Sequence, residues 1–408
     1  MRRGCAVVGA ALLGMLGAGL TATAPAAASA PPPVCAPGVY AEVAGPPPAL
    51  AAMGMPAGER YTGPRIPVTV AVVDSGVDAT RAQLRYTIAP GSTSLIDDGE
   101  RRDGLSDPHG HGTAIAGIIA ARPSDRSGVV GVAPRAHILS VRVFRGEDQQ
   151  SVDAGWGPQA GRVAQGIRLA TDAGAQVIAV ALSDETDAPS LRAATAYATE
   201  HGALVVASAG NRSTASNAAD SPRFPAGYPA ALGVTAVDVN GVATDDSIHG
   251  AHVDVAAPGQ DVLTTSTGGG DCVYAADAPS SSFATGYVAG AAALLAEAFP
   301  AEGPAGWAYR LKASAQRSNP DARTDTLGWG VIRPAAALDL RPDRSTRGPA
   351  SPFADTSEAA FEPPVTTVSA TTVEADGRSA VTAVAVGAAG VVTVLGLIAI
   401  LRRRSVRA

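Results

Sequence analysis

The central part of the chain alternates short apolar runs with longer alanine-rich stretches. Five runs, at residues 68–73, 137–143, 176–181, 203–207 and 233–237, are rich in valine and isoleucine and apolar at nearly every position. Strands buried on both faces have this pattern, whereas half-exposed strands alternate apolar and polar residues. Because helical stretches separate the runs, the pattern predicts an α/β domain: a doubly wound, mostly parallel sheet with helices on both faces.

The beginning of the chain has the pattern of a secretory signal peptide. Arg2 and Arg3 precede an apolar run over residues 5–20, and small residues follow over 21–30. This order of a charged start, an apolar stretch and a small-residue cleavage region predicts a signal peptide over residues 1–30. An uncleaved anchor is the alternative, although the apolar run is shorter than the ~20 residues that a membrane span needs.

The end of the chain has the pattern of a membrane span. Residues 379–401 carry no charged side chain, and a basic tail at residues 402–408 begins with three arginines. At about 1.5 Å per residue, a helix of this length reaches ~34 Å and crosses the hydrocarbon core. The arginines belong on the cytoplasmic side, so we expect a single-pass protein of the cell membrane with everything before the span outside. A buried core helix is the alternative.

Two segments without helical or strand periodicity flank the predicted domain. Residues 31–64 are rich in proline, glycine and alanine and are expected to form an extended arm. Residues 341–378 combine proline, serine, threonine and acidic residues with few large apolar ones, which predicts a flexible stalk. The globular domain is therefore expected over residues 65–340.

Charge and cysteine content indicate which partners the protein can have and in which compartment it lies. Setting aside the six arginines of the two terminal segments leaves 25 basic against 37 acidic residues, an excess that disfavours nucleic acid as a partner. Cys5 lies in the predicted signal peptide, so Cys35 and Cys272 remain as an even pair in an oxidising compartment. One disulfide between them is predicted, with two free thiols as the alternative.

Candidate chemistry follows the predicted strands, where ligand sites of parallel sheets lie. Asp74 ends the first strand, and His111 stands at the start of a helical stretch after a glycine-rich loop. A helix start gives an imidazole the rigid, partly open position that a general base needs, and a nearby carboxylate can orient it. Alternatively, Asp74 serves only as a turn residue. His109 and His111 together could also indicate a metal site, but the sequence shows no further cluster of metal-ligating residues to complete it.

Two further polar residues follow later apolar segments. Asn211 ends the run after the fourth strand, where a side-chain amide can donate to a developing oxyanion. Ser282 opens an apolar helix that runs to about Phe299, and the positive end of the helix dipole favours negative charge there. Taken alone, the asparagine reads equally well as a turn residue and the serine as an ordinary helix cap.

The order Asp, His, Asn, Ser, in the contexts Asp-Ser-Gly, His-Gly-Thr, Ala-Gly-Asn and Ser-Phe-Ala, resembles the subtilisin family of serine proteases. The resemblance covers roughly residues 66–340. The wider layout of signal peptide, arm, domain, stalk and span is similar to that of the mycosins, the membrane-anchored proteases of type VII secretion systems.

The resemblance implies a subtilisin-like fold and a role for each residue. Ser282 is implied to be the nucleophile, His111 the general base and acid, and Asp74 the residue that orients the imidazole. Asn211 and the Ser282 backbone N–H are implied to bind the oxyanion. Ala181, Leu182 and Ser183 are implied to pair with the substrate backbone. Ser208, Ala209 and Gly210 are implied to line a roomy specificity pocket.

The resemblance also implies protein or peptide substrates and no cofactor. Gln83 stands where relatives often carry a calcium-binding aspartate, so we expect no metal there. Ser280 stands where most relatives have glycine, and unusual backbone angles at that position would store ~1–3 kcal/mol of strain. Gly286 replaces a proline of the same motif.

These inferences lead to one expected function and two alternatives. We expect a membrane-anchored, extracytoplasmic serine endopeptidase associated with type VII secretion. The first alternative is a weakly active or inactive subtilase fold that serves as a structural component of a secretion complex, and the altered residues around Ser282 are the observation in its favour. A general cell-surface protease unrelated to secretion is the third reading.

Overall fold

The computed structural model describes residues 31–36, 39, 41–55 and 67–353. The predicted signal peptide, the transmembrane helix at 379–401 and the basic tail at 402–408 lie outside the described residues. So does the larger part of the predicted stalk.

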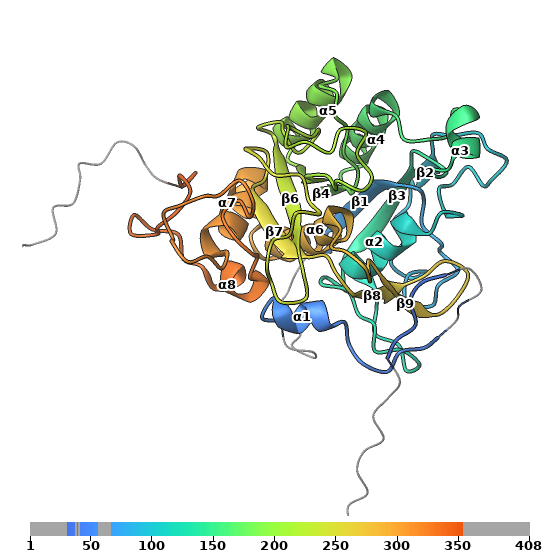
Figure 1. Cartoon of the computed structure of the whole chain (residues 1–408), viewed down its shortest axis with the longest axis horizontal. Coiled ribbons are helices and arrows are strands. Elements are labelled where there is room, and N and C mark those ends of the chain that lie inside the picture. The colour runs from blue at the N-terminus through green and yellow to red at the C-terminus, as the bar shows by residue number, and fades with distance from the viewer. Residues whose placement is uncertain (1–30, 37–38, 40, 56–66, 354–408) are drawn as a thin grey trace, which may run out of the picture. The chain divides into compact units, whose positions relative to one another are not determined.

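A seven-stranded parallel sheet forms the centre of the molecule, with the order β2-β3-β1-β4-β5-β6-β7 (Figure 1). Its strands are Thr69–Asp74 (β1), Thr93–Ser94 (β2), His137–Arg142 (β3), Val177–Val180 (β4), Leu204–Ser208 (β5), Ala231–Val237 (β6) and Val255–Pro258 (β7). Each of the five predicted apolar runs forms a strand. The short strands β2 and β7 were not predicted as strands.

The strands bury alternate residues on opposite faces of the sheet. In β1, Val70 and Val72 belong to one core cluster, whereas Ala71 and Val73 belong to the other. Both sets are almost fully buried, which explains why the run is apolar at every position.

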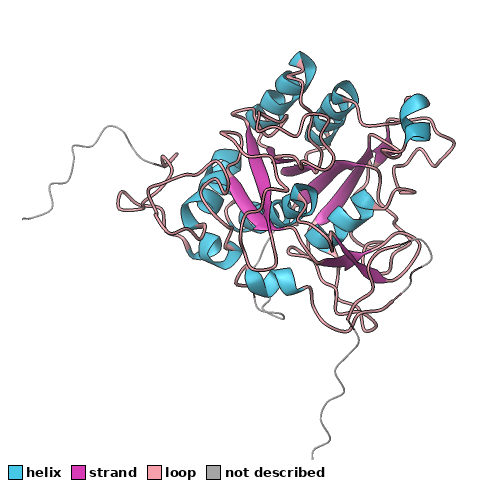
Figure 2. Ribbon diagram, viewed as in Figure 1, coloured by secondary structure: helices cyan, strands magenta, loops and turns pink. Residues whose placement is uncertain are grey.

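Helices cover both faces of the sheet (Figure 2). The first face carries α2, α6, α7 and α8, and the second carries α4 and α5. The helices of the described residues are Pro48–Ala52 (α1), His111–Ala120 (α2), Gln149–Asp153 (α3), Ala160–Asp172 (α4), Pro189–Glu200 (α5), Ser281–Ala298 (α6), the 3₁₀ turn Pro300–Glu302 (η1), Gly303–Ser314 (α7) and Pro334–Asp339 (α8).

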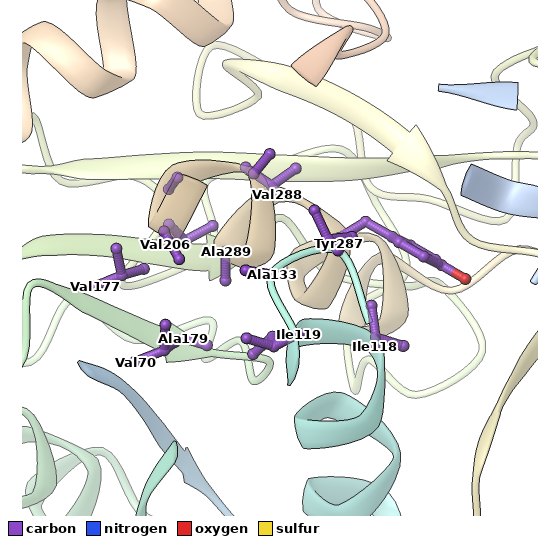
Figure 3. Packing of buried hydrophobic residues seen from close by; sticks show 14 of the residues in the cluster. Val70, Ile118, Ile119, Ala133, Val177, Ala179, Val206, Tyr287, Val288 and Ala289 are labelled. Carbon is purple, nitrogen blue, oxygen red and sulfur yellow. The ribbon is translucent and has the colours of Figure 1, made fainter. Parts of the chain in front are cut away.

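Helix α6 is the central helix of the first face. Figure 3 shows its Val288 and Ala289 close to strand residues such as Val206, with Ile119 of α2 beside them. Nearly every side chain of α6 is buried, so the helix is apolar on all sides. Within the described residues no single helix has the length and apolar character of a membrane span, and only α6 together with the next segment, bent by 101°, passes that test as a pair.

The N-terminal arm lies on the domain beside the antiparallel hairpin Val262–Thr265 (β8) and Asp271–Tyr274 (β9). The structure confirms the predicted disulfide between Cys35 and Cys272, whose Cα atoms are 5.0 Å apart. Val34 forms a parallel bridge with Val273, and the Cys35 N–H donates to the Val273 carbonyl. The arm, predicted to be extended, also contains the short helix α1, which a proline starts and which packs Leu50 against the core.

The described part of the predicted stalk, residues 341–353, is not a free linker. Residues 341–353 lie against the domain, with Arg347 paired to Asp321 and the Phe353 ring 5.7 Å from that of Tyr309. The polar composition of this segment suggested a flexible linker. Arg317, which also donates to the Arg347 carbonyl, helps to hold it.

Candidate active site

The four residues singled out in the sequence lie on four different elements. Asp74 is the last residue of β1, and His111 is the first residue of α2. Asn211 follows β5, and Ser282 is the second residue of α6. The carboxyl ends of parallel strands meet at one edge of a sheet, and this edge is where such folds place their ligand sites.

Asp74 and His111 are in direct contact. His111 Nδ1 lies 2.8 Å from Asp74 Oδ1 and 3.0 Å from Oδ2, and the Ser75 backbone N–H donates to Oδ1 over 2.7 Å. Burial opposes ionisation of Asp74, but the charge and hydrogen bond of His111 outweigh it and hold the pKa of Asp74 below its ordinary value. Asp74 is therefore a carboxylate that fixes one nitrogen of the imidazole.

His111 remains partly open to solvent on its other side, with 18% of its side chain exposed. The Phe283 ring lies 5.5 Å from the imidazole and covers one side of it. Burial lowers the pKa of His111, whereas the negative charges of Asp74, Asp107 and Glu147 raise it, and the net result lies above the ordinary 6.5. The imidazole is thus suited to taking up a proton near neutral pH.

Ser282 lies at the N-terminus of α6, where the helix dipole favours negative charge. Its Oγ donates to the Ala181 carbonyl oxygen over 2.9 Å, and within the described part of the chain no hydrogen bond joins it to His111. Ser280 caps the helix with φ −123° and ψ 125°, ordinary extended angles. The strain expected from a serine at position 280 is therefore absent, because this backbone needs no glycine.

Asn211 is held against the same helix start. Its Oδ1 accepts hydrogen bonds from the Ser281 backbone N–H at 2.8 Å and from the Ser281 hydroxyl at 2.9 Å. Its Nδ2 donates to Ser280 Oγ over a longer 3.3 Å. Because the oxygen is fixed by two donors, the NH₂ group faces the beginning of α6, the orientation that an oxyanion donor requires.

The two segments predicted to contact substrate flank this helix start. Ala181, Leu182 and Ser183 continue from the end of β4, and the Ala181 carbonyl is the one that Ser282 contacts. Ser208 ends β5 and shares a 2.7 Å hydrogen bond with Ser281, which places the segment Ser208, Ala209 and Gly210 beside Asn211.

Two side chains approach Gly210, at the end of the segment implied to line a specificity pocket. Arg223 is 99% buried, and its Cγ lies 3.0 Å from the point where a Cβ on Gly210 would stand. Ser183 Oγ lies 3.2 Å from the same point. The pairing of Phe224 with Asp184 fixes this neighbourhood, because each N–H donates to the other's carbonyl over 2.8 Å.

Neither Arg223 nor the buried Asp107 was given a role from the sequence. Arg223 lies in a loop without periodicity, so no signal marks it. Asp107 stands four residues before His111 in a loop that includes Gly110 and Gly112, and this position is the signal that could have drawn attention to it.

A cavity of about 520 Å³ is lined in part by His109. Asp98, Arg145, Asp148 and Trp156 are among its lining residues. The His109 and His111 rings are 6.2 Å apart, so the cavity lies close to the catalytic candidates. Its lining carries charged side chains of both signs.

Across the described residues, no three His, Cys, Asp or Glu side chains are grouped to hold a metal ion. Gln83, at the position considered for calcium, donates to Asp271 over 3.1 Å.

Comparison with known proteins agrees with this geometry. The model of the Subtilase family matches residues 66–330. Mycosin-1 of Mycobacterium tuberculosis is 35% identical over 379 residues, covering 82% of this chain and 80% of its own. The major intracellular serine protease of Bacillus subtilis is 34% identical over 198 residues, covering 48% of this chain and only 60% of its own.

Solved structures of mycosins are similar to this chain in fold as well as in sequence. MycP1 from the ESX-1 type VII secretion system has a TM-score of 0.60 at 28% identity, covering 78% of this chain and 92% of its own. The MycP3 protease of the ESX-3 system has a TM-score of 0.61 at 29% identity, covering 75% and 91%. With its sheet, its family match and these relatives, the chain belongs to the subtilase family of serine proteases and is similar to the mycosins.

Proposed function

We propose that the protein is a serine endopeptidase that hydrolyses peptide bonds with Asp74, His111 and Ser282. The observation that carries the proposal is the Asp74–His111 pair at 2.8 Å, next to the helix start that holds Ser282 and Asn211. A buried carboxylate that fixes one imidazole nitrogen leaves the other free to act as a base toward a hydroxyl.

The proposed reaction is acyl transfer. The Ser282 hydroxyl turns from the Ala181 carbonyl toward His111, gives its proton to the imidazole and attacks the scissile carbonyl. His111 then passes the proton to the leaving amine, and water repeats the sequence on the acyl-enzyme. Asp74 holds the tautomer and stabilises the imidazolium.

Asn211 Nδ2 and the Ser282 backbone N–H are proposed to bind the oxyanion that forms on the scissile carbonyl. The fixed Oδ1 of Asn211 supports this role, since an amide held in advance needs no reorganisation during the reaction. Residues 181–183 are proposed to pair with the substrate backbone, and residues 208–210 to line the pocket for the side chain before the cleaved bond.

The setting proposed for the enzyme is the outer face of the cell membrane, with residues 1–30 as signal peptide and 31–64 as arm. A protease domain over 65–340, a stalk, a span at 379–401 and a cytoplasmic tail complete the layout. Association with a type VII secretion system is supported by similarity to MycP1 and MycP3, which are described from such systems. No nucleic acid is expected as a partner.

One observation favours the alternative of a weakly active or inactive structural component. The Ser282 hydroxyl is engaged with Ala181 and not with His111. In free proteases, catalytic hydrogen bonds are often long and tighten only when substrate binds, so this contact does not exclude activity.

Digestion of unfolded casein by the full-length chain, compared with Ser282→Ala, tests the enzymatic proposal. Loss of cleavage in the variant is expected, and equal cleavage by both would contradict it. Accessibility of the domain to added protease in spheroplasts tests the topology. Purification of the membrane complex tests the secretion link, because a general surface protease would purify without secretion components.

A further inference from the structure

Asp107 is a buried carboxylate beside the catalytic candidates, with 3% of its surface exposed. Its Oδ1 accepts hydrogen bonds from Ser75 Oγ and the Gly110 backbone N–H, both at 2.8 Å. Its Oδ2 accepts from the Thr113 backbone N–H at 2.8 Å and from the Thr113 hydroxyl at 2.6 Å. Both oxygens are therefore fully engaged.

Some of these hydrogen-bond partners are sequence neighbours of Asp74, and the others are neighbours of His111. Ser75 directly follows Asp74, whereas Gly110 and Thr113 flank His111 on the loop and first turn of α2. One carboxylate thus binds the backbone of the histidine segment to the strand end that carries Asp74.

A second contact closes the same network. The Gly112 backbone N–H donates to Ser75 Oγ over 2.9 Å, so the serine hydroxyl links the histidine segment to Asp107. The two segments approach so closely that a Cβ on Gly112 would stand 2.1 Å from the Gly76 carbonyl oxygen. The separation of Asp74 from His111 is therefore set by this network as well as by their own contact.

The network bears on the charge of Asp107. Burial raises the pKa of Asp107 above its ordinary value, although the hydrogen bonds from Thr113, Ser75 and Gly110 oppose that rise. Two of the contacting groups are backbone N–H groups, which can only donate, and the other two are hydroxyls that each accept from another backbone N–H, of Gly112 at Ser75 and of Asp78 at Thr113, while they donate to Asp107. The site therefore accommodates the carboxylate, which places a second negative charge near His111.

We propose that Asp107 is a positioning residue of the catalytic pair: it holds His111 at its distance from Asp74 and supplies a second negative charge that stabilises the imidazolium. The inference rests on the proposed function, because it assumes that His111 is the base. It extends that proposal by giving a role in catalysis to a group that does not touch the substrate.

The titration of His111 gives a readout that does not depend on activity. The groups that face its imidazole are Asp74 at the end of β1, Asp107 and His109 in its own loop, and Glu147 after β3. Helix α6 contributes the apolar Phe283. Replacing Asp107 by asparagine changes one of these charges and leaves the others in place.

The test uses the full-length chain labelled with ¹⁵N-histidine, whose His111 signal is assigned by its loss in His111→Gln. Asp107→Asn is expected to lower the pKa of His111 by about 0.5–1 unit and to slow labelling by a fluorophosphonate probe about 10–100-fold. The matched control is Asp103→Asn, the same change at an aspartate of the preceding loop that pairs with Arg101. It should leave both values unchanged.

Ser75→Ala separates position from charge, since it removes the hydroxyl link and a weaker 3.2 Å contact of the same hydroxyl with Asp74 Oδ1, but keeps both carboxylates and the Ser75 N–H bond to Asp74. It should slow labelling severalfold while the His111 pKa stays near the wild-type value. The inference is overturned if Asp107→Asn lowers only the melting temperature, or if Ser75→Ala is labelled as fast as the wild type. If Asp107→Asn does not fold, the labelling rate of Ser75→Ala alone decides. A wild-type chain that is not labelled refutes the proposed function, and the His111 titration then decides the inference about Asp107 by itself.

Discussion

The Ser282 hydroxyl donates its hydrogen bond to the carbonyl oxygen of Ala181, 2.9 Å away. Ala181 begins the segment proposed to pair with substrate, so the nucleophile rests against the place where a peptide would bind. A change of one side-chain rotamer turns the hydroxyl away from this carbonyl, and such changes between staggered positions are small in energy. We therefore interpret the contact as the resting position of the nucleophile.

Asn211→Ala is expected to slow the reaction with a peptide substrate by about 10²–10³-fold, the range established for an oxyanion donor in this family. The same change leaves the buried Ser281 N–H without its acceptor, so unfolding should become easier by about 1–3 kcal/mol. Steady-state kinetics and urea unfolding measure the two effects. A variant that is destabilised but keeps the wild-type rate would remove Asn211 from the mechanism.

The rate of fluorophosphonate labelling should depend on the protonation of His111. Since the neutral imidazole is the base and Asp74 raises its pKa, the rate should rise with pH through a midpoint above the ordinary 6.5. Asp74→Asn removes the charge, so the midpoint should move to lower pH and the rate should fall by about 10⁴-fold. A pH–rate profile at constant ionic strength measures both, and an unchanged midpoint would contradict the role of Asp74.

The disulfide should stabilise the fold considerably, because it joins residues that are 237 positions apart. Replacing Cys35 and Cys272 together by serine is expected to lower the free energy of unfolding by about 2–5 kcal/mol. Thermal melting of the oxidised full-length chain and the double variant measures the difference. Reduced wild-type protein serves as the control and should melt near the variant. Coincident melting of all three would show that the bridge has no stabilising effect.

Arg223 should restrict the residue before the cleaved bond to small side chains. Its stem fills the space beside Gly210, so Arg223→Ala is expected to raise the kcat/KM for phenylalanine relative to alanine at this position by about 10–100-fold. Arg212→Ala, in the same loop but salt-bridged to Asp220, is the matched control. An unchanged ratio, or a wild-type preference for acidic side chains, would show that the arginine does not close the pocket in this way.

The sequence predicted the parts of the fold that have strong local signals. The five apolar runs became strands, and the contexts of Asp74, His111, Asn211 and Ser282 resembled one family. Asp74, His111 and Ser282 lie at the end of a strand or the start of a helix, and Asn211 lies in the loop that follows β5. Strand β7 was missed because it is four residues long and ends in proline, which suits an edge strand and weakens the signal.

Roles that depend on contacts between distant segments were not predictable. Asp107 acts through Ser75, which is 32 positions away, and Arg223 reaches Gly210 through the folding of a loop. The position of Asp107 near His111 marks the residue itself, but nothing in the sequence marks its partner Ser75, and Arg223 leaves no periodic or compositional signal. The same reason explains the docking of residues 341–353, whose composition resembles that of a linker.

The central claim, a catalytic Ser282 activated by His111, is tested most directly by locating the residue that a fluorophosphonate probe modifies. The full-length chain is labelled and its peptides are analysed by mass spectrometry, with Ser280→Ala and Ser282→Ala as matched variants of two serines that are two positions apart. The account predicts a single phosphonylated residue, Ser282, with labelling retained in Ser280→Ala and lost in Ser282→Ala. A folded wild-type chain that takes up no probe, or labelling that persists in Ser282→Ala, would contradict it.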